Sequence, residues 1–137
     1  MLRLGLLLVF LVLLLAGCGG GGSVSQKDVQ KQFEAIQSLA AEGALVADGA
    51  ADGRSTDVFV RVHSGYLNCA ADKVATNLSS ARASGAADRE RERAASLATH
   101  VADRLGTLSD EPGDTAGARR IAAELRADAA LAKRLAG

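Results

Sequence analysis

Two histidines, His63 and His100, are the side chains of this sequence best suited to bind a metal ion or move a proton. A metal site in a helical protein usually pairs a histidine with an acid three or four residues away on the same helix face. Asp103 follows His100 at that spacing, whereas His63 has only apolar or aromatic neighbours there. A single pair of one histidine and one acid provides too few ligands for a metal site. We therefore expect no metal or other cofactor, a packed or half-buried His63 and a solvated His100.

A hydroxyl nucleophile needs a base and an orienting group within reach. Ser64 follows His63 directly in the sequence. Neighbouring residues on a helix point about 100° apart, however, so this adjacency does not create a catalytic pair. No glycine-rich loop follows a strand-like segment in the way a phosphate-binding loop does. The sequence therefore predicts a protein that is not an enzyme.

Three larger side chains, Phe59, His63 and Tyr66, recur at helical spacing within one segment. They concentrate most of the bulky, polarizable side chains that follow the N-terminal apolar run. We expect them to form the widest part of a hydrophobic core. The alternative is a small apolar pocket, in which the imidazole of His63 and the hydroxyl of Tyr66 would orient a small ligand.

The N-terminus has the composition of a secretory signal peptide. A nearly unbroken apolar run of 13 residues, Leu4 to Ala16, follows the basic residue Arg3. A helix of that length covers roughly 20 Å, whereas a spanning helix must cross about 30 Å of hydrocarbon. A cleaved export signal is therefore favoured over a permanent transmembrane anchor.

A cysteine ends the apolar run, directly after two small residues, in the sequence Leu15-Ala16-Gly17-Cys18. This segment resembles the lipobox of bacterial lipoproteins. The resemblance implies that the Cys18 sulfur receives a diacylglyceryl group and that cleavage precedes Cys18, leaving acyl chains such as palmitate as the anchor. Residues 1–17 would then be the signal peptide, 18–24 a lipidated cysteine with a flexible Gly/Ser tether, and 25–137 the exported domain.

The second cysteine, Cys69, has no partner if Cys18 is lipidated through its sulfur. An unpaired thiol in an oxidising compartment is either buried or open to reaction. We expect Cys69 to be buried by packing, with a redox role or a mixed disulfide as the alternative.

Helical periodicity runs through the exported domain, in keeping with its alanine content; the chain contains 28 alanines. Four segments repeat apolar residues every three or four positions, at about 25–51, 55–83, 86–108 and 115–135. Short breaks rich in Asp, Gly and Pro separate them. The segment Val58–Val62 has strand composition, but its apolar stripe continues in helical register. The sequence predicts an all-α fold, an antiparallel Ala-rich bundle of four helices.

The charge composition bears on which classes of partner the protein can bind. The formal net charge is zero, with 16 basic and 16 acidic residues. A balanced chain is a poor electrostatic binder of nucleic acid. The run Asp88–Arg93 alternates in sign, with opposite charges three apart, which is typical of a solvated helix face.

Taken together, these features predict a lipoprotein of the cell membrane, anchored through Cys18 and facing the extracytoplasmic side. We expect its domain to act without catalysis, through contact with an envelope protein or with itself. A helical bundle that binds a small ligand or metal through Phe59, His63 and Tyr66 is the alternative. The resemblance extends to small helical lipoproteins in general and to no narrower family.

Overall fold

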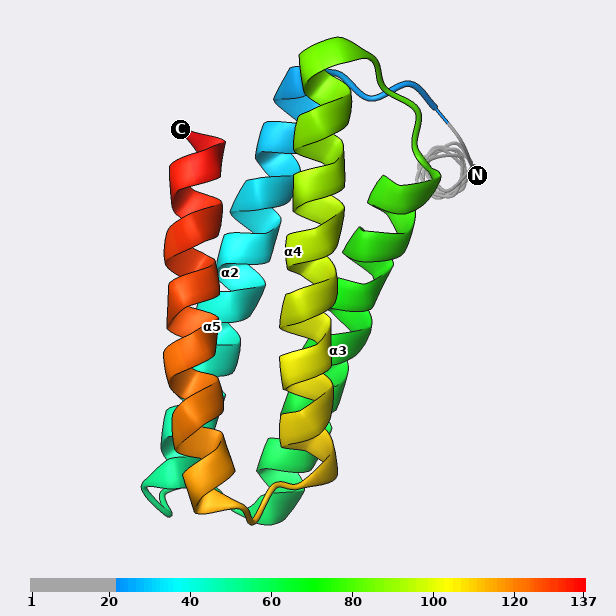
Figure 1. The fold of residues 1–137 in the computed structure, drawn as a ribbon. Coiled ribbons are helices and arrows are strands. Elements are labelled where there is room, and N and C mark those ends of the chain that lie inside the picture. The colour runs from blue at the N-terminus through cyan, green and yellow to red at the C-terminus, as the bar shows by residue number, and fades with distance from the viewer. Residues whose placement is uncertain (1–21) are drawn as a thin grey trace, which may run out of the picture.

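The computed structural model describes residues 22–137. The predicted signal peptide, Cys18 and the first part of the tether lie outside these residues. Four α-helices make up most of the described chain (Figure 1). The all-α class and the four-helix bundle are thus confirmed. The helices are α2 (Gln26–Ala51), α3 (Asp57–Ser80), α4 (Gly85–Asp110) and α5 (Thr115–Ala136).

Local sequence signals set the helix ends. Ser25 caps α2 in a reciprocal capping box with Asp28, whose carboxylate accepts a hydrogen bond from the Ser25 backbone N–H at 3.0 Å. Thr56 caps α3, and Asp114 caps α5 by accepting from the Gly117 N–H at 2.9 Å. Gly53, with φ of 66°, turns the chain between α2 and α3 in a conformation that costs other residues more.

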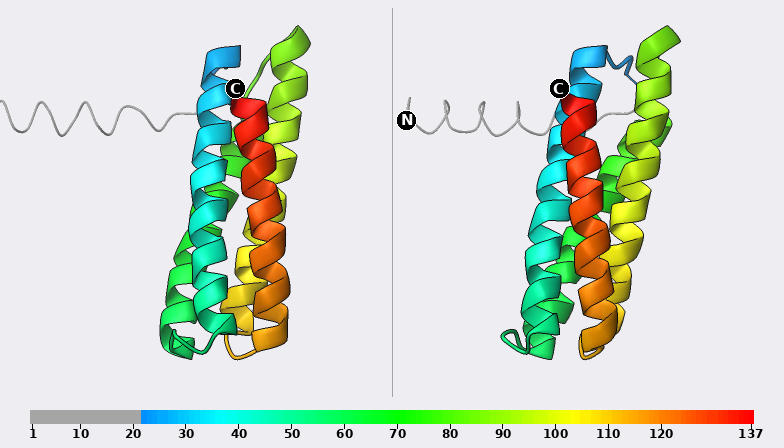
Figure 2. Two further views of the ribbon diagram at one scale, coloured as in Figure 1. Left: turned by 90° about the vertical axis from the view of Figure 1, so that its left-hand side faces the viewer. Right: turned by 60° about the vertical axis from the view of Figure 1, so that its left-hand side comes forward.

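The helices alternate in direction, so neighbours along the chain are antiparallel (Figure 2). The closest backbone approaches are between α2 and α5 and between α3 and α4. Contact between α2 and α4 crosses the bundle, whereas the backbones of α3 and α5 do not approach each other closely. The cross-section is therefore a flattened rhombus, with α3 and α5 at its far corners.

Alanine makes these close approaches possible, because its methyl group leaves little between two backbones. The apolar residues that periodicity predicts to be buried on α2 and α4 are all buried; they are Val29, Phe33, Ile36, Ala40, Ala44 and Ala47 on α2, and Ala94, Leu97, Val101, Leu105 and Leu108 on α4. On α5, the predicted positions Ala118, Ile121, Leu125 and Ala132 are also buried, whereas Ala129 is only partly covered. The larger fully buried side chains that fill the centre are Phe33, Ile36, Leu67, Leu105, Leu108 and Leu125.

Gly43 lies where α2 comes closest to the leucines of α4 and α5. A Cβ atom at this position would stand 2.5 Å from Leu105 Cδ2 and 3.1 Å from Leu125 Cδ1. We expect Gly43→Val to lower the free energy of unfolding by about 1–3 kcal/mol, because it overpacks a closed core. Chemical denaturation followed by circular dichroism measures this change. Ala41→Val, at an exposed position of the same helix, is the control, and equal losses in both variants would contradict the packing.

One end of the bundle holds the start of the described chain. The Val24 N–H donates to the carbonyl of Arg82 at 2.9 Å, and Ser23 forms an isolated bridge with Arg82. The first turn of α2, the α3–α4 connection and the C-terminus of α5 all lie at this end (Figures 1 and 2). We call it the tether end, because the described chain begins here and the predicted tether precedes it in the sequence.

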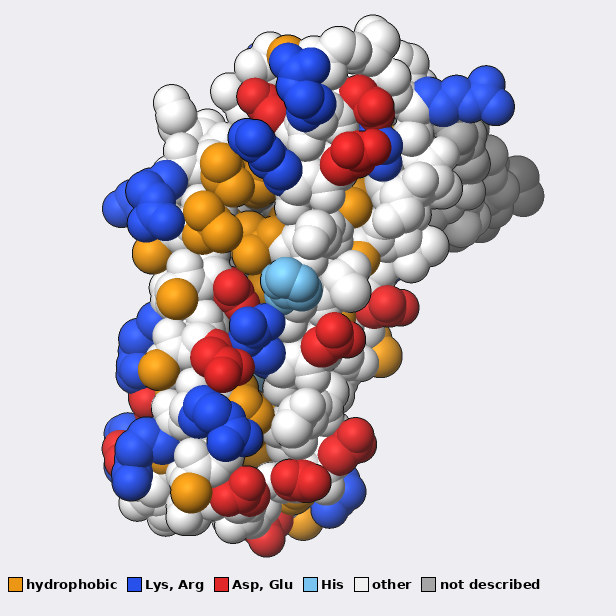
Figure 3. All heavy atoms as spheres, viewed as in Figure 1, with side chains coloured by type: hydrophobic (Ala, Val, Ile, Leu, Met, Phe, Trp, Pro, Cys, Tyr) orange, Lys and Arg blue, Asp and Glu red, His pale blue; other side chains and the backbone are white. Residues whose placement is uncertain are grey.

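Charge is distributed unevenly along the bundle axis. The half of each helix nearer the tether end, with its connections, carries ten basic and seven acidic residues; the other half carries five and nine. In Figure 3, many of the acidic side chains on the face formed by α4 and α5 lie in this second half of the bundle. The tether end is therefore positive and the far end negative.

Among residues 22–137, no helix is both long enough and apolar enough to cross a bilayer.

Candidate functional site

The register of α3 differs from the expected one. The sequence predicts Phe59 and Tyr66 in the core, but the buried positions are Val60, Ser64 and Leu67, which are at most 1% exposed. Ser64 can be buried because its hydroxyl donates to the carbonyl of Val60 within the same helix. The assignment of Phe59 and Tyr66 to the core is wrong, and their side chains lie on the opposite side of α3.

The outward face of α3 is apolar over its first half. Val58, Val62 and Tyr66 follow one another at four-residue steps and are 71%, 66% and 72% exposed; Phe59, beside them, is 49% exposed. Side chains at this spacing are neighbours on a helix surface. We call these four residues the α3 ridge. A solvated helix normally carries polar side chains on the face opposite its core.

His63 lies on the flank of the α3 ridge, half-buried as expected. Its Nε2 atom is 2.8 Å from the carboxylate of Glu42 on α2, and its ring stacks on Phe59 with 5.2 Å between centroids. Leu45, one turn from Glu42 on α2, is 72% exposed. Of the three predicted ligand-binding residues, the structure thus brings Phe59 and His63 together, while Tyr66 points mostly into solvent.

Cys69 is exposed, one turn beyond Tyr66 on the same side of α3. The prediction of a buried thiol is therefore wrong. The cause is the register of α3: positions 67 and 71 face the core, which turns position 69 outward. Cys69 extends the α3 ridge by a turn and is a free thiol.

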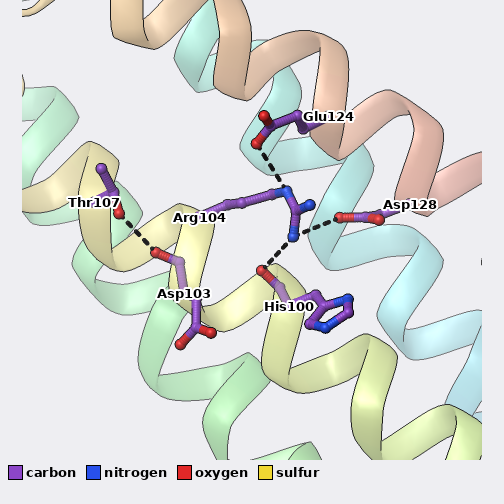
Figure 4. Close-up of polar contacts among 6 residues, drawn as sticks. All are labelled: His100, Asp103, Arg104, Thr107, Glu124 and Asp128. Atoms are coloured by element: carbon purple, nitrogen blue, oxygen red, sulfur yellow. Dashed lines mark hydrogen bonds and ion pairs between the residues drawn. The ribbon is translucent and has the colours of Figure 1, made fainter.

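A polar cluster joins α4 to α5 at the level of His100 (Figure 4). Arg104 donates from Nε to Glu124 at 3.0 Å and from Nη1 to the carbonyl of His100 at 3.0 Å. Its Nη1 also lies 3.5 Å from Asp128 Oδ2, in an ion pair. His100 itself is exposed, as expected, and Asp103 points away from the cluster. This cluster fixes the register of α4 against α5.

Asp128 is the member of this cluster whose hydrogen-bonding capacity is not satisfied. Its Oδ2 atom is buried and accepts no hydrogen bond from the described residues. Burial raises the pKa of the Asp128 carboxyl, and the opposing attraction of Arg104 is the smaller effect. The folded protein therefore holds this proton more tightly than the unfolded chain does.

This difference predicts a pH dependence of stability. The unfolded carboxyl titrates near its ordinary pKa of 3.8 and the folded one above it, so the contribution of Asp128 to stability falls as pH rises through this interval. We expect Asp128→Asn to raise the free energy of unfolding at pH 7 by about 1 kcal/mol, and to change it little at pH 3. Denaturation curves at both pH values measure the effect. Asp103→Asn, at an exposed acid of α4, is the control; parallel pH profiles of wild type and Asp128→Asn would contradict the assignment.

Sequence reasoning missed the role of Arg91. The expected pair with Asp88 is present at 2.8 Å, but the guanidinium also donates to the carbonyl of Leu78 near the end of α3, at 2.9 Å. The Arg91 side chain is only 13% exposed. Part of the alternating charge run is therefore a link between α3 and α4 and not a solvated face.

The described residues contain no group of three or more His, Cys, Asp or Glu side chains arranged to hold a metal ion. Comparison with protein-family models, with curated proteins and with solved structures finds no match.

Proposed function

We propose that this protein is an exported, lipid-anchored and non-enzymatic module of the cell envelope that acts through protein contact at the α3 ridge. The observation that carries the proposal is the ridge itself. It exposes two of the three aromatic residues that follow the apolar run, together with two valines. Exposed apolar surface of this kind, bordered by polar residues, is typical of protein interaction sites.

The anchor part of the proposal depends on the lipobox-like segment ending at Cys18. The charge of the bundle supports it, because the tether end carries the basic excess. Each Lys or Arg held near an anionic membrane surface contributes about 1 kcal/mol of attraction. A tethered bundle would thus stand with its basic end toward the headgroups and the α3 ridge in the half away from them.

The composition around the α3 ridge favours a protein over the bilayer as its partner. Helices that lie in a membrane surface carry an excess of Lys and Arg beside their apolar face. Here Arg61 and Lys73 are offset by Asp72 and by Glu42 of α2. Aromatic side chains such as Tyr66 are, in contrast, frequent anchors of protein interfaces.

The exposed thiol of Cys69 provides a direct test in native membranes. A bound partner should shield Cys69, so an impermeant maleimide should react slowly with the wild-type chain. We expect Val62→Asp to remove the partner and to speed the reaction severalfold, while changing the free energy of unfolding by no more than about 0.5 kcal/mol. Ala41→Asp, at an exposed position of α2, should leave the reaction slow.

Protein-free phospholipid vesicles carrying the full-length chain complete this test. A fast reaction at low protein density supports a separate partner protein. Protection that grows with density identifies a second copy of the chain, which is still protein contact. Protection at low density would place the ridge on the bilayer and contradict the proposal. Equal rates for wild type and Val62→Asp in native membranes would also contradict it.

A further inference from the structure

A groove of about 370 Å³ opens between α4 and α5, in the half of the bundle nearer the tether end. Figure 3 shows apolar side chains gathered between these helices, with Lys and Arg side chains beside them. Leu97 forms part of the groove and is 5% exposed, whereas Leu131 is 37% exposed. Leu135 completes the apolar wall. The groove is thus an apolar surface with no protein covering it among the described residues.

The polar side chains that line the groove are all able to donate hydrogen bonds. They are Arg93, Ser96 and His100, and the lining includes no carboxylate. Arg93 forms no ion pair with any residue from 22 to 137, in contrast to Arg104 one helix turn beyond His100. Arg134 is next to Leu135 on α5, and the nearest acid on this side of the helix, Asp128, is paired with Arg104. The charge of the site therefore complements an anion.

The dimensions of the groove indicate a small occupant. Arg93 and His100 are seven residues apart on α4, which corresponds to about 10 Å along the helix. The volume is near the lower end of the range for small-molecule sites, about 300–1,000 Å³. A site of this size holds one short hydrocarbon chain and is too small for a two-chain phospholipid.

We propose that the α4–α5 groove binds one molecule of an anionic single-chain amphiphile, such as a medium-chain fatty acid. The chain lies against Leu97, Leu131 and Leu135, and the anionic group meets Arg93. This inference is independent of the α3 ridge, which is on another part of the bundle. The source is a free amphiphile and not a phospholipid of the bilayer.

A photoreactive decanoic acid tests this site on the full-length chain in native membranes. We expect saturable labelling, mapped by peptide mass spectrometry to residues 93–100 and 131–135. Unlabelled decanoate should compete, whereas decylamine of the same chain length should not. Each methylene group added from octanoate to decanoate should strengthen competition by at most about fourfold, the value for full burial.

Two variants separate binding from folding. Leu131→Trp fills the groove and should abolish labelling, whereas Leu45→Trp, at an exposed leucine of α2, should not change it. Arg93→Gln alters only an exposed side chain; it should weaken competition by decanoate severalfold and leave competition by decanol unchanged. Together these results would support the site.

Three results would overturn the proposal. Labelling spread over other helices would show partitioning into the membrane and no site. Equal competition by decanoate and decylamine would remove the anion preference. If decanoate failed to compete while Leu131→Trp weakened binding to phosphatidylglycerol vesicles, the groove would be a contact with bilayer phospholipid and not a site for a free amphiphile.

Discussion

Phe33→Ala is expected to lower the free energy of unfolding by about 3–5 kcal/mol, the cost of removing a fully buried phenyl ring. Phe33 is 0% exposed and lies in the first half of α2. Two other aromatic residues of the described chain, Phe59 and Tyr66, lie on the surface. Alanines supply many of the remaining core positions, and their short side chains cannot move into the vacated space. The cavity would therefore stay largely open.

Such a loss is a large share of the whole stability of a small domain, which is about 5–15 kcal/mol. Urea denaturation followed by circular dichroism at 222 nm, the helical band, measures it. Phe59→Ala is the matched control, because that ring is 49% exposed, and its expected cost is no more than about 1 kcal/mol. Equal losses for the two variants would contradict the register of α3 and the position of the core.

Cys18→Ala is expected to abolish acylation and the maturation of the chain. If Cys18 is the acceptor, the variant has no sulfur for the thioether, and the cleavage that precedes a lipidated cysteine does not follow. Acyl chains contribute about 0.8 kcal/mol per buried methylene group, and two chains are sufficient for stable attachment. The loss of the anchor is therefore the largest effect that a single substitution is expected to have on localisation.

Metabolic labelling with palmitate and the intact mass of the membrane form measure this effect. The wild-type chain should incorporate label and have the mass of a mature form that begins at Cys18. Cys18→Ala should remain an unlabelled precursor that retains its leader. Cys69→Ala should behave as the wild type does. An unlabelled wild-type chain, or unchanged processing of Cys18→Ala, would contradict the lipid anchor.

The helical segments could be predicted from the sequence because their signals are local. A capping residue starts α2, α3 and α5, and Gly53 lies in the break between α2 and α3. The apolar stripes of α2 and α4 are narrow, so one face of each helix is clearly marked as buried. For these elements every predicted stripe residue is buried, and the buried faces are wider than the stripes because they also include residues such as Val46 and Ala98.

The face of α3 that packs into the core could not be predicted in the same way. Its first turns carry valines on both faces, so periodicity alone does not choose between Val60 and Val62 as the buried one. Ranking the aromatic residues as core then selected the wrong face. The correct face is marked by residues at helical spacing, Val60, Ser64, Leu67 and Ala71. Because Ser64 is polar, this set does not stand out as an apolar stripe.

The α4–α5 groove and the Arg104 cluster depend on the register between two helices. Residues more than 20 positions apart, such as Leu97 and Leu131, form the groove together. The sequence of either helix contains no information on which residues of the other lie opposite. From the sequence alone, Asp128 is indistinguishable from a solvent-exposed acid. Its burial results from the packing of α4 against α5.

Site-specific photo-crosslinking from the α3 ridge in intact cells tests the central claim most directly. A photoreactive amino acid at Val58, Val62 or Tyr66 of the anchored chain should give the same discrete protein adduct. The same amino acid at Arg119, an exposed position of α5, should give none. Adducts that are identical from the ridge and from Arg119, or absent from the ridge, would contradict a protein contact at this surface.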